Sequence, residues 1–208
     1  MDADAPTRRK APVAAPVRWR AAIAVAVVLC AALGGTRGAL ADDERELQVE
    51  AAFLVNFVRY TDWPPARLGP PGAPYVVSVL GSEDEARDVA DVASAAGTID
   101  GRRIEVQRVD PDRLSRSAAK VRRLQASHVV FVRADSGVRC ATVRSLLGGA
   151  PVLTVGDATG CAATGGMFGL VRVDRHLAFE ANPDEIHAAG LAVSAKVLKL
   201  ARIRRSVP

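Results

Sequence analysis

The chain has 208 residues, with 28 Lys and Arg against 23 Asp and Glu, and therefore a formal net charge of +5. Hydrophobic residues make up 49% and charged residues 25%, proportions that exclude an intrinsically disordered chain. The length favours one folded domain with a short additional segment.

Residues 1–41 have the pattern of a secretory signal peptide. Basic residues come first, an apolar run follows over Ala21–Leu33, and the sequence Ala39-Leu40-Ala41 comes after it. This order is what the export machinery and its peptidase recognise, and it predicts cleavage after about Ala41 and a single mature domain over residues 42–208. An uncleaved membrane anchor is the alternative, although the apolar run is short for a membrane span.

The basic excess of the chain lies mostly in this segment. Six basic and two acidic residues fall within residues 1–41, which leaves 22 basic and 21 acidic residues in the mature chain and a net charge of +1. Nucleic-acid binding proteins need a basic patch to neutralise phosphates. The mature chain therefore gives no electrostatic reason to expect a nucleic-acid partner.

Glu44–Tyr60 is predicted to be a helix that is apolar on two faces. One face carries Leu47, Ala51, Leu54, Val55 and Val58, and the other carries Val49, Phe53, Phe57 and Tyr60. A helix of this kind is usually covered on both sides. The second face is thus expected to meet another helix or a second subunit.

Strands and helices then alternate along the chain. Strands are predicted over Tyr75–Leu80, Arg103–Val109, His128–Val132 and Pro151–Val155, and helices over Glu83–Ala95, Asp112–Leu124 and Gly137–Leu147. This order indicates an α/β fold with a mostly parallel sheet and helices on both faces.

The end of the chain has a different pattern. Met167–Asp174 and His176–Ala181 are predicted to form a β-hairpin. The sequence Asn182-Pro183-Asp184-Glu185 is a strong helix start, with an Asn cap, a Pro in the first position and two acids in the first turn. A long final helix is expected after it, with one apolar face made of Ile186, Gly190, Val193, Val197 and Leu200.

Two cysteines remain after the signal segment, Cys140 and Cys161. In an oxidising compartment an even pair commonly forms a disulfide, and two unrelated buried thiols are the alternative. Both residues follow predicted strands of a parallel sheet and so lie beyond the same edge, which makes a bond between them geometrically natural.

Catalytic signatures are absent from the sequence. It contains neither a G-x-S-x-G motif nor a phosphate loop that ends in Gly-Lys-Ser/Thr. His128, His176 and His187 do not have the spacing of metal ligands, and His128, which opens an apolar strand, is predicted to be structural. We therefore expect a protein that is not an enzyme, with no catalytic residues, no metal and no cofactor.

Two long blocks stand in an order shared with a known family. The first is Ala51-Ala52-Phe53-Leu54-Val55-Asn56-Phe57 followed by Trp63-Pro64. The second comprises Gly165-Gly166-Met167-Phe168, Phe179-Glu180-Ala181-Asn182 and the segment from Ala188 to Ala201. Over about residues 44–203 the chain resembles the YfiR-like (HmsC-like) family of periplasmic repressors.

This resemblance implies regulation without catalysis. In the best-known branch, the protein lies in the periplasm, binds the periplasmic sensor portion of a membrane-bound diguanylate cyclase and represses cyclic di-GMP synthesis, which affects biofilm formation. An outer-membrane lipoprotein draws it away from the cyclase. The resemblance also implies that the protein forms a homodimer. The competing hypothesis is a periplasmic small-molecule-binding sensor for another signalling or transport system, since α/β sheets bind ligands at the carboxyl ends of their strands.

The resemblance also implies a partner-binding surface on Phe168, Glu180 and Ile186. A large aromatic side chain in a Gly-flanked segment, such as Phe168, suits a binding anchor. Each residue has a structural alternative, because Phe168 and Ile186 fit a core and Glu180 suits the start of a helix.

Overall fold

The computed structural model describes residues 45–174 and 176–205. The predicted signal peptide, with its cleavage site after Ala41, lies outside the described residues, and the division of the chain at this site stays a prediction. Within the described ranges, no helix has both the length and the apolar character that crossing a membrane requires.

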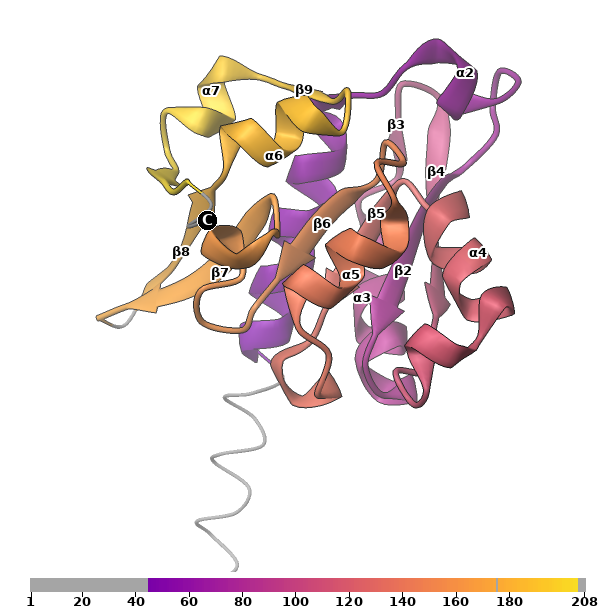
Figure 1. Cartoon of the computed structure of the whole chain (residues 1–208). Helices are drawn as coiled ribbons and strands as arrows, with labels where there is room; N and C mark the ends of the chain where they lie inside the picture. Colours follow the sequence, from indigo (N-terminus) through magenta and orange to yellow (C-terminus); the bar gives the residue numbers. More distant parts are fainter. Residues whose placement is uncertain (1–44, 175, 206–208) are drawn as a thin grey trace, which may run out of the picture. The chain divides into compact units, whose positions relative to one another are not determined.

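A mostly parallel sheet of eight strands forms the centre of the described chain (Figure 1), in the order β10-β8-β7-β6-β5-β2-β4-β3. Its strands are β2 (Tyr75–Leu80), β3 (Thr98–Ile99), β4 (Arg102–Arg108), β5 (Val129–Val132), β6 (Leu153–Gly156), β7 (Phe168–Val173), β8 (His176–Ala181) and β10 (Arg202–Ile203). The five strands from β7 to β4 are parallel, and β8 returns antiparallel to β7. The predicted α/β fold and its C-terminal hairpin are confirmed.

The order of the strands reverses at β2. The chain passes from β2 to its neighbour β4, and then returns to β5 on the other side of β2. In open α/β sheets, ligands bind in the crevice outside the carboxyl ends of the two adjacent strands between which the order reverses. The loops after the neighbouring strands β2 and β5 therefore occupy the position in which a ligand site is expected.

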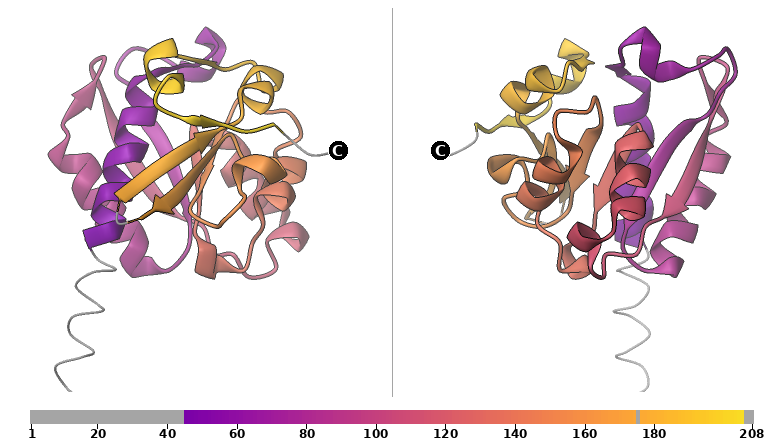
Figure 2. Two further views of the ribbon diagram at one scale, coloured as in Figure 1. Left: turned by 90° about the vertical axis from the view of Figure 1, so that its left-hand side faces the viewer. Right: turned by 45° about the vertical axis from the view of Figure 1, so that its right-hand side comes forward.

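Helices cover both faces of the sheet (Figure 2). The N-terminal helix (residues 45–59) and α3 (Glu83–Ala95) pack on one face, where the larger apolar cluster lies. On the other face, α4 (Ala118–Ala126) and α5 (Cys140–Leu147) cover a smaller cluster. The strands β5 and β6 are buried on both faces, as expected for a parallel sheet.

The second apolar face of the N-terminal helix is only partly free. Phe57 is 1% exposed and Phe53 packs against the larger cluster. Val49 and Tyr60 remain 47% and 40% exposed. Most of the apolar surface from which a second subunit was predicted is therefore used inside the domain.

The predicted helix over Asp112–Leu124 is wrong in its first half. A 3-10 turn, η1 (Leu114–Arg116), comes first, and α4 begins after Ser117, whose side chain accepts a hydrogen bond from the backbone N–H of Lys120. The serine cap offers the backbone an alternative to a continuous helix. The predicted helix over Gly137–Leu147 is confirmed from its fourth residue on, since α5 begins at Cys140. A 3-10 turn, η2 (Ala134–Ser136), lies before the predicted range.

The prediction of a long final helix is also wrong. The predicted start is confirmed, since Asn182 caps α6 (Pro183–Ala188) by accepting a hydrogen bond from the Glu185 N–H. Gly190 then takes a left-handed conformation (φ +70°), and the Leu191 N–H bonds to the Ile186 carbonyl. This arrangement is a Schellman motif, which ends the helix.

Short elements make up the rest of the described chain. β9 (Ala192–Val193) pairs with β1 (Thr61–Asp62), and α7 (Ala195–Leu198) leads to β10 at the sheet edge. The remaining elements are α2 (Pro65–Leu68) and η3 (Ala162–Thr164). Leu200, expected on a buried helical face, is instead 77% exposed.

Candidate functional site

A disulfide joins Cys140 at the start of α5 to Cys161 in the loop after β6, with their Cα atoms 5.4 Å apart. The predicted bond is confirmed. The bond lies close against the end of β6, because a Cβ placed on Gly156 would be 2.6 Å from the Cys161 sulfur. A side chain at this position would force the disulfide or the strand to move.

Phe168 lies in the interior. It is 0% exposed, and its ring stacks on Phe57 of the N-terminal helix with centroids 4.1 Å apart and planes inclined by 2°. Phe179 meets both rings at a steep angle. This aromatic cluster joins the two blocks of the family resemblance, since Phe57 belongs to the first block and Phe168 and Phe179 belong to the second.

Glu180 and Ile186 are also buried, at 5% and 4% exposure. Glu180 on β8 pairs with Gly169, the residue after Phe168, so its side chain points to the opposite face of the sheet from the Phe168 ring. The Glu180 Oε1 accepts hydrogen bonds from Arg204, whose Nη2 lies 2.6 Å away.

The structure therefore places Phe168 and Ile186 in one core cluster and Glu180 outside it. Of the Glu180–Arg204 pair, only Arg204 is substantially exposed, at 50% of its side chain. The assignment of these three residues to partner binding stays a prediction, and any such role would act through surface residues that they support.

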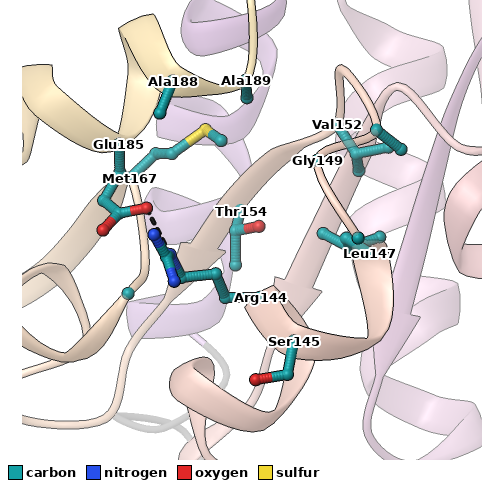
Figure 3. A pocket seen from close by; sticks show the side chains of 13 residues that line it. Arg144, Ser145, Leu147, Gly149, Val152, Thr154, Met167, Glu185, Ala188 and Ala189 are labelled. Atoms are coloured by element: carbon teal, nitrogen blue, oxygen red, sulfur yellow. Dashed lines mark hydrogen bonds and ion pairs between the residues drawn. The ribbon is translucent and has the colours of Figure 1, made fainter.

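A hollow of about 280 Å³ lies between α5, β6 and α6 (Figure 3). Arg144 of α5 reaches toward Glu185 of α6, with the Nε atom 2.5 Å from the Oε2 atom. Met167, Val152 and Leu147 provide apolar wall. Small-molecule pockets are usually larger than this, and the charges at its edge already pair with each other, so the hollow offers little to a ligand.

A buried charged cluster lies at the carboxyl edge of the sheet. Arg133 directly follows β5, and three carboxylates from three other segments surround its guanidinium group. The Glu85 Oε1 lies 2.5 Å from its Nε, the Asp157 Oδ2 lies 2.6 Å from its Nη1, and Glu50 of the N-terminal helix also contacts Nη1. We call these four residues the Arg133 cluster.

Negative charge exceeds positive charge in the Arg133 cluster, and the pKa values reflect this. Burial raises the pKa of Glu50 to about 7, although Arg133 opposes the shift. Burial also raises the pKa of Asp157. For Glu85, burial is outweighed by hydrogen bonds from Ser82 and Arg133, and its pKa is lowered. Near neutral pH, Glu50 thus gains or loses a proton.

Sequence reasoning did not identify the Arg133 cluster. A usable signal was present, since Arg133 and Asp157 each directly follow an apolar strand that is buried on both faces. Within the described residues, no group of three His, Cys, Asp or Glu side chains could hold a metal ion. The cluster joins the N-terminal helix, α3 and the loop after β6 to the end of β5 by ion pairs.

His128 has the structural role that was predicted for it. Its Nδ1 accepts a hydrogen bond from the Val76 N–H at 3.0 Å, and its ring meets the rings of Trp63 and Tyr75 edge-on. Burial lowers the pKa of His128 to about 4, so the ring is neutral at physiological pH. Trp63 of the first family block thus helps to hold the start of β5.

Comparison with known proteins identifies one family. A family model described as YfiR/HmsC-like matches residues 47–202, which include both sequence blocks, the aromatic cluster and the disulfide. No curated protein matches the chain.

Proposed function

Because the chain belongs to the YfiR/HmsC-like family, we propose that it is a periplasmic regulatory protein that binds the periplasmic sensor portion of a membrane-bound diguanylate cyclase and represses cyclic di-GMP synthesis. Biofilm formation would change with its activity. The observation that carries this proposal is the family match over residues 47–202. The role is regulatory and not catalytic.

The proposed location is the periplasm, with the signal peptide removed after about Ala41. The disulfide between Cys140 and Cys161 supports this location, because structural disulfides persist in oxidising compartments. N-terminal sequencing of protein from the periplasmic fraction is expected to begin near Asp42. A mature protein that retains Ala21–Leu33 would contradict cleavage and make this a tethered protein.

A homodimer is part of the proposal. Exposed large apolar side chains support it, namely Val49, Tyr60, Leu200 and Ile203 at 47%, 40%, 77% and 52% exposure. Ile203 lies on β10, the edge strand of the sheet, and an unpaired edge can add a strand from a second chain. An outer-membrane lipoprotein is the second proposed partner, one that would withdraw the repressor from the cyclase.

Within this proposal, the three family positions act on the partner surface in different ways. Phe168 and Ile186 would fix the shape of that surface from inside. Glu180 would orient Arg204, which is the exposed member of the pair. A Glu180→Gln variant that folds and is exported normally is therefore expected to repress less well than the wild type.

The test is genetic and biochemical. Deleting the gene is expected to raise cellular cyclic di-GMP, and expression of the wild-type protein from a plasmid is expected to restore the lower level. The purified mature protein should also bind the isolated periplasmic domain of the cyclase. If cyclic di-GMP is unchanged by deletion, the cyclase is not the target, and a small-molecule sensor for another signalling or transport system becomes the better interpretation.

A further inference from the structure

The loops after β4 and β5 border an open hollow of about 400 Å³. One wall comes from η1 and the residues before it, and the other comes from Gly137 to the first turn of α5. These loops follow the two strands that pair with β2 on either side. The hollow lies beyond the carboxyl ends of parallel strands, and its volume is within the usual range for small molecules.

Three arginines line this hollow, Arg113, Arg116 and Arg139, and no acidic residue does. The hydroxyl-bearing residues Ser115 and Thr142 are also part of its wall. We call these five residues the arginine pocket. Positive charge gathered without a counter-charge is costly unless an anion or solvent compensates it.

The three arginines of the pocket are exposed, and none forms an ion pair with any carboxylate in the described parts of the chain. Several arginines elsewhere are paired, as Arg108 is with Asp110 and Arg144 is with Glu185. Their donors are therefore available to a ligand.

Acidic residues close to the pocket form no ion pair with its arginines. Arg113 and Arg116 also border an adjoining hollow that contains Asp110 and Asp112. The Asp110 carboxylate is held by Lys120, whose Nζ lies 2.7 Å from its Oδ2. The start of α5 adds positive potential, because its N-cap residue is Arg139 and no side-chain hydrogen bond caps this end.

The walls of the pocket are held in place before any ligand arrives. Leu114 of η1 is 3% exposed and packs into the smaller apolar cluster, and Val138 packs against the same cluster. The Ser136 hydroxyl accepts a hydrogen bond from the Val138 N–H, and Cys140, next to Arg139, is fixed by the disulfide. Pre-organised walls lower the entropic cost of binding.

We propose that the arginine pocket binds a small organic anion that carries at least two negative charges, of the phosphate or polycarboxylate type. The planar guanidinium group presents paired N–H donors that match two oxygens of a phosphate or carboxylate. Three such groups around one hollow suit a ligand with several oxyanion atoms. The proposal is independent of which membrane protein the chain regulates.

The test is calorimetric titration of the mature protein with inorganic pyrophosphate and, separately, with citrate, at constant ionic strength. Saturable binding of one ligand per chain is expected for at least one of them. Tighter binding of pyrophosphate would assign the phosphate type, and tighter binding of citrate would assign the polycarboxylate type.

The decisive comparison uses two variants. The double variant Arg113→Gln/Arg139→Gln is expected to weaken binding by about tenfold or more. The control Arg122→Gln removes an exposed charge from α4 outside the pocket, and it is expected to change affinity by less than about twofold. Failure of both anions to saturate, or an equal loss of affinity in the control, would overturn the proposal. Circular dichroism of all variants verifies that they fold.

Discussion

Arginines lie in two different settings at the carboxyl edge of the same sheet. In the Arg133 cluster, one arginine that is 16% exposed is shared by three carboxylates. In the arginine pocket, three exposed arginines share a hollow with no acidic lining residue. The first region has excess negative charge and the second has excess positive charge.

The difference shows how one residue type serves two purposes. The charge of Arg133 is used internally, because it joins the N-terminal helix, α3 and the loop after β6 in one network. The charges of the pocket form no ion pair among the described residues. Removing them should therefore change the free energy of unfolding little but weaken the binding of an anion strongly. Substitutions in the two regions should therefore differ clearly in their effect on the free energy of unfolding.

The largest effect is expected from Arg133→Met. This substitution keeps an apolar stem but leaves three buried carboxylates without their cation, and loss of one partner from a buried ion pair costs about 3–5 kcal/mol. Urea unfolding monitored by circular dichroism measures this loss. The matched control is Arg87→Met, since the Arg87–Asp84 pair is exposed and exposed pairs contribute at most about 1 kcal/mol. A loss below about 1 kcal/mol for Arg133→Met would contradict the structural role of the cluster.

The next effect concerns the disulfide, which connects the two regions. Cys140 follows Arg139 of the pocket, and Cys161 lies in the loop that begins with Asp157 of the cluster. The bond spans 21 residues of sequence, for which chain-entropy arguments give about 3 kcal/mol of stabilisation. A Cys140→Ser/Cys161→Ser variant should lose about this amount in urea unfolding. Free thiols in protein isolated from the periplasm would contradict the bond itself.

Titration of Glu50 gives a smaller effect that depends on pH. The folded protein keeps a proton on Glu50 up to about pH 7, whereas the unfolded chain releases it near pH 4.5. Between these values the folded state binds more protons, so the contribution of Glu50 to the free energy of unfolding falls as the pH rises. His128, with its pKa lowered to about 4, contributes with the opposite sign up to about pH 6.5.

His128 contributes equally to the free energy of unfolding of the wild type and of Glu50→Gln, so its contribution cancels when the two proteins are compared. The variant is expected to gain stability relative to the wild type by about 2–3 kcal/mol between pH 5 and pH 8. Urea unfolding at several pH values provides the measurement. A stability difference that is constant over this range would show that Glu50 does not titrate there.

Features that depend on neighbouring residues in the sequence could be predicted, whereas the charged sites, which depend on distant residues, could not. The boundaries of Tyr75–Leu80, Glu83–Ala95 and the start of α6 could be predicted, because periodicity and caps are local signals. The prediction of a long final helix is wrong because apolar residues at helical spacing continue past Gly190, whereas this glycine ends the helix.

The charged sites required the three-dimensional structure. The Arg133 cluster unites residues separated by up to 107 positions, from Glu50 to Asp157. Although Arg133 and Asp157 each follow a buried strand, nothing in the local sequence links the four residues to one another. The same is true of the arginine pocket, whose residues come from two loops that only the reversal at β2 brings together. The disulfide was predictable because just two cysteines remain after the signal segment.

The smallest effect on stability is expected from Arg139→Gln in the arginine pocket. The Arg139 side chain is exposed and forms no ion pair among the described residues, and surface substitutions of this kind usually change stability by less than about 0.5 kcal/mol. Loss of one of three neighbouring positive charges also relieves repulsion, so a slight stabilisation at low salt is expected. Urea unfolding at low and high salt tests this, with Arg122→Gln as the control. A loss above about 1 kcal/mol would show that Arg139 supports the fold, and the contrast with Arg133 would then fail.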